Sequence, residues 1–110
     1  MAYDVELAER IREHLSGEPV TEKKMFGGLA FLLGGNMSVA ASGQGGLMVR
    51  VDPNETEALL AEPGAAEFEM AGRGPMKGWL RVSPDVLGDD ETLGAWVSRG
   101  VAYARTLPPK

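Results

Sequence analysis

The sequence predicts an α+β fold in which helices cover one face of an antiparallel sheet. Near both ends of the 110-residue chain, apolar residues recur at the spacing of an amphipathic helix. Between these segments, apolar residues alternate with other residues and Gly-rich stretches separate the runs, which is typical of strands joined by turns. A chain of this length supports a single core, so we expect residues 1–110 to form one two-layer domain.

A helix over residues 4–16 is the first predicted element. Asp4 can cap it, because a carboxylate at this position accepts the free N–H groups of the first helical turn. Ser16-Gly17 can end it, because glycine tolerates the left-handed conformation that follows many helices. The apolar stripe that would face the core consists of Leu7, Ile11 and Leu15.

Three strands in a meander are predicted next. Alternation over residues 22–33 indicates one long strand, and Gly27-Gly28 within it indicates a bulge or a bend. Gly34-Gly35-Asn36 accepts positive φ and predicts a tight turn into a second strand over residues 37–41. After a looser glycine-rich turn, alternation predicts the third strand over residues 47–51.

The second half of the chain is predicted to hold a helix, two strands and a last helix. Asp52-Pro53 is a strong helix start, because a capping Asp precedes a Pro at the first helical position, and this helix should run to about residue 62. Residues 67–71 predict a short edge strand and residues 79–83 a second strand, which gives the order α-β-β-β-α-β-β-α. The final helix, led by Asp89, has an apolar stripe that consists of Leu93, Trp96, Val97, Val101 and Ala104.

Charges are sorted along the chain. The sequence has 16 acidic and 11 basic residues, a net charge of −5 at pH 7. Residues 23–51 and 70–84 contain six of the bases and no acid, so the other five bases and all 16 acids leave −11 elsewhere. Because the charge is segregated, the negative total does not exclude an anionic partner. The six bases are Lys23, Lys24, Arg50, Arg73, Lys77 and Arg81.

The chain lacks the side chains that most metal sites and covalent enzymes use. It has no cysteine, and its one histidine, His14, is expected on the solvated side of the first helix. Neither a Gly-x-Ser-x-Gly elbow nor a Cys/His pair is present. We therefore predict no catalytic residue, no metal and no cofactor, and a protein that is not an enzyme.

The same sequence predicts a cytoplasmic protein without a membrane partner. Its N-terminus lacks a basic region followed by an apolar one, so no signal peptide is expected. The longest apolar run, Leu29–Leu33, is too short to cross a bilayer. The absence of cysteine suits a reducing compartment.

Four motifs follow one another in a specific order along the chain. Together with the flanking helices, they resemble the N-terminal domain of the TfoX/Sxy family, which are competence regulators of bacteria. The resemblance covers about residues 3–107 and implies a stand-alone copy of this domain, with a two-layer fold similar to type III secretion chaperones and often dimeric. It implies no catalytic residue. The motifs are Lys23-Lys24-Met25-Phe26-Gly27-Gly28, Gly35-Asn36-Met37, Leu47-Met48-Val49-Arg50-Val51 and Gly72-Arg73-Gly74-Pro75-Met76-Lys77-Gly78-Trp79.

The leading functional hypothesis is a regulatory interaction module that forms a homodimer and binds an unidentified protein. Helices on one face of an antiparallel sheet leave the other face open, and apolar residues there would favour self-association. An uncharacterised enzyme is the least supported reading. The candidate dimer face consists of Phe26, Ala30, Leu32 and Met48.

The alternative hypothesis is anion or nucleic-acid binding through the six bases, with Trp79 as a stacking group. On the predicted meander, Lys23 lies about 23 Å from Arg50, so one compact site cannot use all six bases. A smaller set, Arg73 and Lys77 with Arg81 or the two lysines, is the more plausible site. The competing structural interpretation is that these cations pair with the acidic helices and keep the strand edges soluble.

Overall fold

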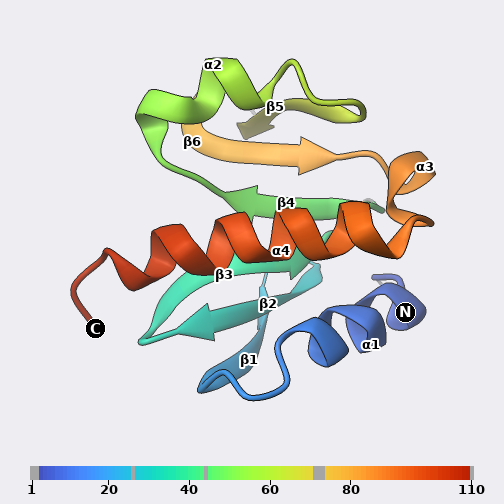
Figure 1. Ribbon diagram of the computed structural model, residues 1–110, viewed down its shortest axis with the longest axis vertical. Coiled ribbons are helices and arrows are strands. Elements are labelled where there is room, and N and C mark those ends of the chain that lie inside the picture. Colours follow the sequence, from blue (N-terminus) through green and yellow to red (C-terminus); the bar gives the residue numbers. More distant parts are fainter. Residues whose placement is uncertain (1–2, 26, 44, 71–73, 110) are drawn as a thin grey trace.

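The computed structural model describes residues 3–25, 27–43, 45–70 and 74–109, and for residues 25, 69, 70 and 74–77 it describes the backbone alone. This part of the chain contains an antiparallel sheet with helices packed on one side (Figure 1). The elements are α1 (Val5–His14), β1 (Val20–Met25), β2 (Gly28–Leu33), β3 (Asn36–Ala41), β4 (Leu47–Arg50), η1 (Pro53–Glu55), α2 (Thr56–Leu59), β5 (Ala65–Met70), β6 (Gly74–Val82), α3 (Pro84–Leu87) and α4 (Asp90–Arg105).

The predicted α+β class is confirmed. Within the described residues the sheet has six strands in the order β1-β2-β3-β4-β6-β5, and every neighbouring pair is antiparallel. Figure 1 shows α4 crossing β3 and β4, with α1 beside it. Among the described helices, none is long and apolar enough to cross a membrane.

The prediction of one long strand over residues 22–33 is wrong. β1 and β2 are two strands that pair antiparallel, with Lys23 opposite Ala30, and the chain reverses at Gly27, where φ is +74°. A side chain at Gly28 is excluded as well, because its Cβ would lie 2.2 Å from the carbonyl oxygen of Ala41. Gly27 therefore belongs to a turn, Gly28 begins β2, and the meander has four strands.

The other predicted elements are present with shifted ends. Asp52 does cap a helix start, since its carboxylate accepts the Asn54 N–H at 2.9 Å, but the first turn is the 3₁₀ helix η1 and α2 ends at Leu59. β5 is the predicted edge strand and β6 the second one, and both begin earlier than expected. The short helix α3 was not predicted. Asp89 caps α4, with its carboxylate accepting the Glu91 N–H at 3.4 Å.

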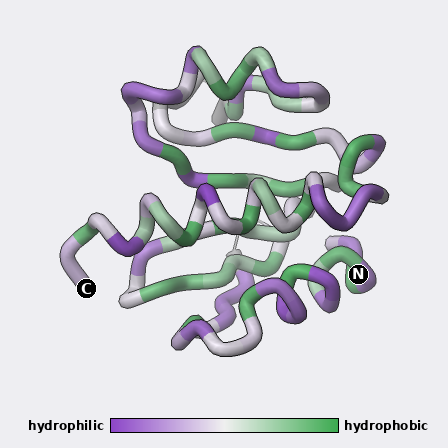
Figure 2. The backbone as a smooth tube through the Cα atoms, viewed as in Figure 1, coloured by the Kyte–Doolittle hydropathy of each residue, from purple (hydrophilic) through white to green (hydrophobic). Residues whose placement is uncertain are grey.

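A helix-side core fills the space between the helices and the sheet. Its largest fully buried side chains are Trp96 on α4 and Phe31 on β2. All five residues of the predicted α4 stripe are buried, as is the predicted α1 stripe. Figure 2 shows the matching pattern, with hydrophobic residues along β2, β3 and β4 and hydrophilic ones recurring along α1 and α4.

A β-bulge in β3 lies close to Gly100 of α4. Phe31 pairs with Val39 and Leu32 pairs with Met37, so Ser38 is the extra residue on β3. The buried Ser38 hydroxyl donates to the Phe31 carbonyl at 2.9 Å, which satisfies this polar group inside the core.

His14, which was expected on the solvated side of α1, is partly buried and contacts α4. Its imidazole packs against Gly94 of α4, and its Nε2 lies 3.2 Å from Asp90 Oδ1, where it can donate a hydrogen bond. Arg10 donates to the same carboxylate oxygen at 3.3 Å. The single histidine therefore helps to hold α1 against the start of α4.

Acidification is expected to destabilise the wild-type protein more than an Asp90→Asn variant. The pKa of Asp90 is lowered in the folded protein, first by the hydrogen bond from His14 and also by that from Arg10. A carboxyl group with a lowered pKa stabilises the fold above its unfolded pKa of about 3.9, and this stabilisation is lost as the pH falls through the folded value. Urea unfolding at neutral pH and at about pH 3 measures the loss for both proteins. Equal losses would contradict this role of Asp90.

Candidate functional site

The sheet face opposite the helices, which we call the outer face, carries an aligned row of side chains. Residues directly opposite one another in an antiparallel sheet point to the same side. The strand registers align one such row across the whole sheet, from one edge strand to the other. The row consists of Lys23, Ala30, Ala40, Met48, Arg81 and Ala66.

The middle of the outer face is an apolar cluster, which we call the outer cluster. It places three of the predicted dimer-face residues, Ala30, Leu32 and Met48, together, whereas Phe26 lies outside the described residues. Ala30 is fully buried and Met48 is 7% exposed within the single chain, so a partner would meet mainly the half-buried members. The outer cluster consists of Ala30, Met37, Ala40 and Met48, with Leu32, Phe68 and Trp79 packed against them.

The structure separates the six predicted cations. Lys23, Arg50 and Arg81 belong to the outer face, since they lie opposite or beside members of the outer cluster. Lys24 lies opposite Leu29, a residue of the helix-side core, and so points to the other side of the sheet. An anion site to which both lysines contribute, one of the predicted alternatives, is therefore not favoured. Arg73 and the side chain of Lys77 lie outside what the structure describes.

The corrected strand pairing also shortens the distance from Lys23 to Arg50. The prediction of about 23 Å placed both residues on one three-stranded meander. The observed register puts Met48 level with Lys23, three strands away, and Arg50 is two residues further along β4. Strand spacings of about 4.8 Å and rises of about 3.3 Å then give about 16 Å between the two Cα atoms.

The outer-face cations have no carboxylate partner among the described residues, in contrast to the cations of the helices. Arg12 of α1 pairs with Glu22 at 2.6 Å, and Arg99 of α4 pairs with Glu62 at 3.5 Å. The described ion pairs use cations of α1 and α4, and none uses Lys23, Lys24, Arg50 or Arg81. The interpretation that these four pair with the acidic helices is therefore not supported in the described part of the chain.

Two of the outer-face groups contact each other. The Arg50 guanidinium carbon lies 5.2 Å from the centroid of the Trp79 ring and 5.7 Å from that of Tyr103 on α4. Trp79 also meets Phe68, with ring centroids 6.5 Å apart. Both Trp79 contacts are cation–π or aromatic pairs that fix the ring in place.

Sequence reasoning missed Phe68 as a member of this surface and Tyr103 of α4 as a contact of Arg50. Phe68 alternates with Glu67 and Glu69 on the predicted edge strand, and this alternation could have assigned it to the face opposite the two acids. No local pattern points to Tyr103, because it belongs to a helix far along the chain from Arg50.

Comparison with known proteins gives one match. The family model of the TfoX N-terminal domain matches residues 13–104, most of the chain. No curated protein matches the chain, and no solved structure does. The predicted likeness to secretion chaperones therefore stays a prediction.

Proposed function

Since the chain belongs to the TfoX N-terminal domain family, we propose that it is a non-enzymatic interaction module that binds an acidic protein through the outer face. The observation that carries the proposal is the charge of this face. It combines three cations without described carboxylate partners with an apolar centre, and none of its described strand side chains is acidic. Charge complementarity of this kind selects partners and speeds their association.

An acidic protein fits this surface better than a nucleic acid does. A nucleic acid is a long polyanion that extends beyond the face and meets the acidic remainder of a protein with a net charge of −5. A protein can match a local positive surface with a local negative one. Trp79, the predicted base-stacking group, already contacts Arg50 and Phe68.

Homodimerisation through the same face is the second candidate, and the apolar outer cluster is the observation that favours it. A two-fold axis through the face would bring the cations of both copies together, and their repulsion is screened by salt. A dimer of this kind should therefore strengthen with increasing salt in sedimentation experiments. Binding of an acidic partner should weaken under the same change.

A titration followed by amide NMR tests the proposal. The probes are a short poly-glutamate peptide and a thymidine oligonucleotide of equal charge. We expect the peptide to shift the amides of Lys23, Arg50 and Arg81 and the indole of Trp79. Reversing two charges, in a Lys23→Glu/Arg81→Glu variant, should weaken peptide binding about tenfold, because exposed ion pairs contribute up to about 1 kcal/mol each.

The control variant changes the net charge equally at another place. Arg99→Glu/Arg105→Glu reverses two cations of α4, on the helix side of the sheet, and should leave peptide binding within about twofold. Equal weakening by both variants would contradict a site on the outer face. Stronger binding of the oligonucleotide than of the peptide would overturn the acidic-protein proposal in favour of nucleic acid.

A further inference from the structure

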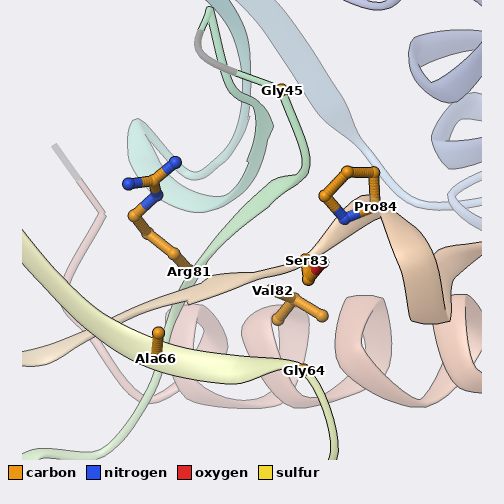
Figure 3. A pocket seen from close by; sticks show the side chains of 7 residues that line it. All are labelled: Gly45, Gly64, Ala66, Arg81, Val82, Ser83 and Pro84. Carbon is orange, nitrogen blue, oxygen red and sulfur yellow. The ribbon is translucent and has the colours of Figure 1, made fainter.

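A cavity of about 220 Å³ opens where β6 ends and two turns meet it. One turn joins β3 to β4 and contributes Gly45, and the other precedes β5 and contributes Gly64. Glycines and an alanine leave the cavity open because they carry little or no side chain. Its volume is several times the roughly 30 Å³ of one water molecule, enough for a polyatomic ion. The cavity is lined by Gly45, Gly64, Ala66, Arg81, Val82, Ser83 and Pro84 (Figure 3).

Arg81 is the one charged residue among the described residues of this lining. Figure 3 shows its side chain leaving β6 on the side away from Val82, whose side chain is buried in the helix-side core. Arg81 is half-buried and has no carboxylate partner among the described residues. A partly desolvated guanidinium without a counter-ion is stabilised strongly when an anion binds it.

Ser83 supplies a second hydrogen-bond donor in the same cavity. Its Oγ accepts the Asp85 N–H at 3.3 Å, which leaves the hydroxyl proton available to a ligand. Both residues line the cavity; Arg81 belongs to β6 and Ser83 follows its last residue, so an extended chain places their Cα atoms about 7 Å apart. An oxyanion between them could accept from both side chains.

From these observations we infer that the cavity is a binding site for the phosphate group of a small ligand. The planar guanidinium of Arg81 can donate hydrogen bonds to two oxygens of an oxyanion. The Ser83 hydroxyl then needs a third oxygen as acceptor, which phosphate has and a carboxylate lacks. Among the described residues, no carboxylate lines the cavity to repel such a group. This site is additional to the proposed protein interface, although Arg81 belongs to both.

The test uses small anions and no macromolecule. Sodium phosphate, sodium acetate and sodium chloride are titrated into the labelled protein at constant ionic strength, followed by amide NMR and by the side-chain Nε–H signal of Arg81. We expect phosphate to shift the signals of Gly45, Arg81 and Ser83 saturably, with acetate clearly weaker. Arg81→Gln should weaken phosphate binding about tenfold or more, the effect of losing hydrogen bonds to a charged group.

Two variants separate a site from general charge effects. Arg81→Lys keeps the positive charge but loses the paired N–H donors of the guanidinium, and should weaken phosphate binding several-fold. Arg99→Gln removes an equal charge that is already paired with Glu62, and should leave phosphate binding unchanged. Shifts of equal size with chloride, acetate as strong as phosphate, or equal effects of Arg81→Gln and Arg99→Gln would each overturn the phosphate site. None of these results affects the peptide titration that tests the proposed interface.

Discussion

Replacing Trp96 by alanine is expected to destabilise the protein by about 4 kcal/mol. Trp96 is the largest fully buried side chain, 1% exposed, and it sits in the helix-side core between α4 and the sheet. Its loss removes apolar burial and leaves a cavity that the surrounding strands cannot close without shifting. The Arg99 guanidinium, 4.5 Å from the centroid of the ring, loses a cation–π contact as well. Urea unfolding followed by far-UV circular dichroism measures the loss.

The other tryptophan provides the matched control. Trp79 is half-buried on the outer cluster, so Trp79→Ala should destabilise by only about 2 kcal/mol and leave the helix-side core intact. A similar loss for both variants would mean that the outer cluster contributes as much stability as the main core. A Trp96→Ala loss below about 1 kcal/mol would contradict the assignment of Trp96 to the centre of that core.

Gly100→Ala is expected to destabilise the protein by about 2 kcal/mol, although alanine is the better helix former. A Cβ at this position of α4 would lie 2.4 Å from the carbonyl oxygen of Ser38 and 2.8 Å from Cγ1 of Val39. The first contact is with the backbone of the β-bulge, so no side-chain rotation can relieve it. α4 would have to move away from β3, and its buried stripe would lose packing.

The control for this variant is Gly88→Ala, between α3 and α4. Gly88 has a φ of −63°, and a Cβ added there has no atom within 4 Å. The free energy of unfolding should stay unchanged or rise by about 0.5 kcal/mol. If Gly100→Ala proves as stable as Gly88→Ala, the close approach of α4 to the bulge is disproved.

Much of the fold could be predicted from local patterns. The buried stripe of α4 follows from its helical period, and the opposite faces of Met48 and Val49 follow from alternation in β4. The capping residues Asp4 and Asp52 act where they were expected, because capping involves only the next few N–H groups. Each of these features depends on residues within one or two turns of each other.

The candidate site was only partly predictable. The shared orientation of Ala30, Leu32 and Met48 and that of Trp79 and Arg81 were predicted correctly, because alternation assigns them. The alignment of Lys23 with Arg81 was missed, because it depends on the β1–β2 hairpin, and the alternation over residues 22–33 is the same for one strand or two. The contact of Arg50 with Tyr103 also required the packing of α4 on the sheet.

The sequence by itself thus determined the α+β class, the type of most elements, the family and the segregation of charge. Only the tertiary structure decided which strands pair, which cations share the outer face, and that His14 joins α1 to α4. The physical reason is the range of the interactions. Periodicity and capping act within a few residues, whereas strand register and helix packing join residues far apart in the chain and depend on how well both partners fit.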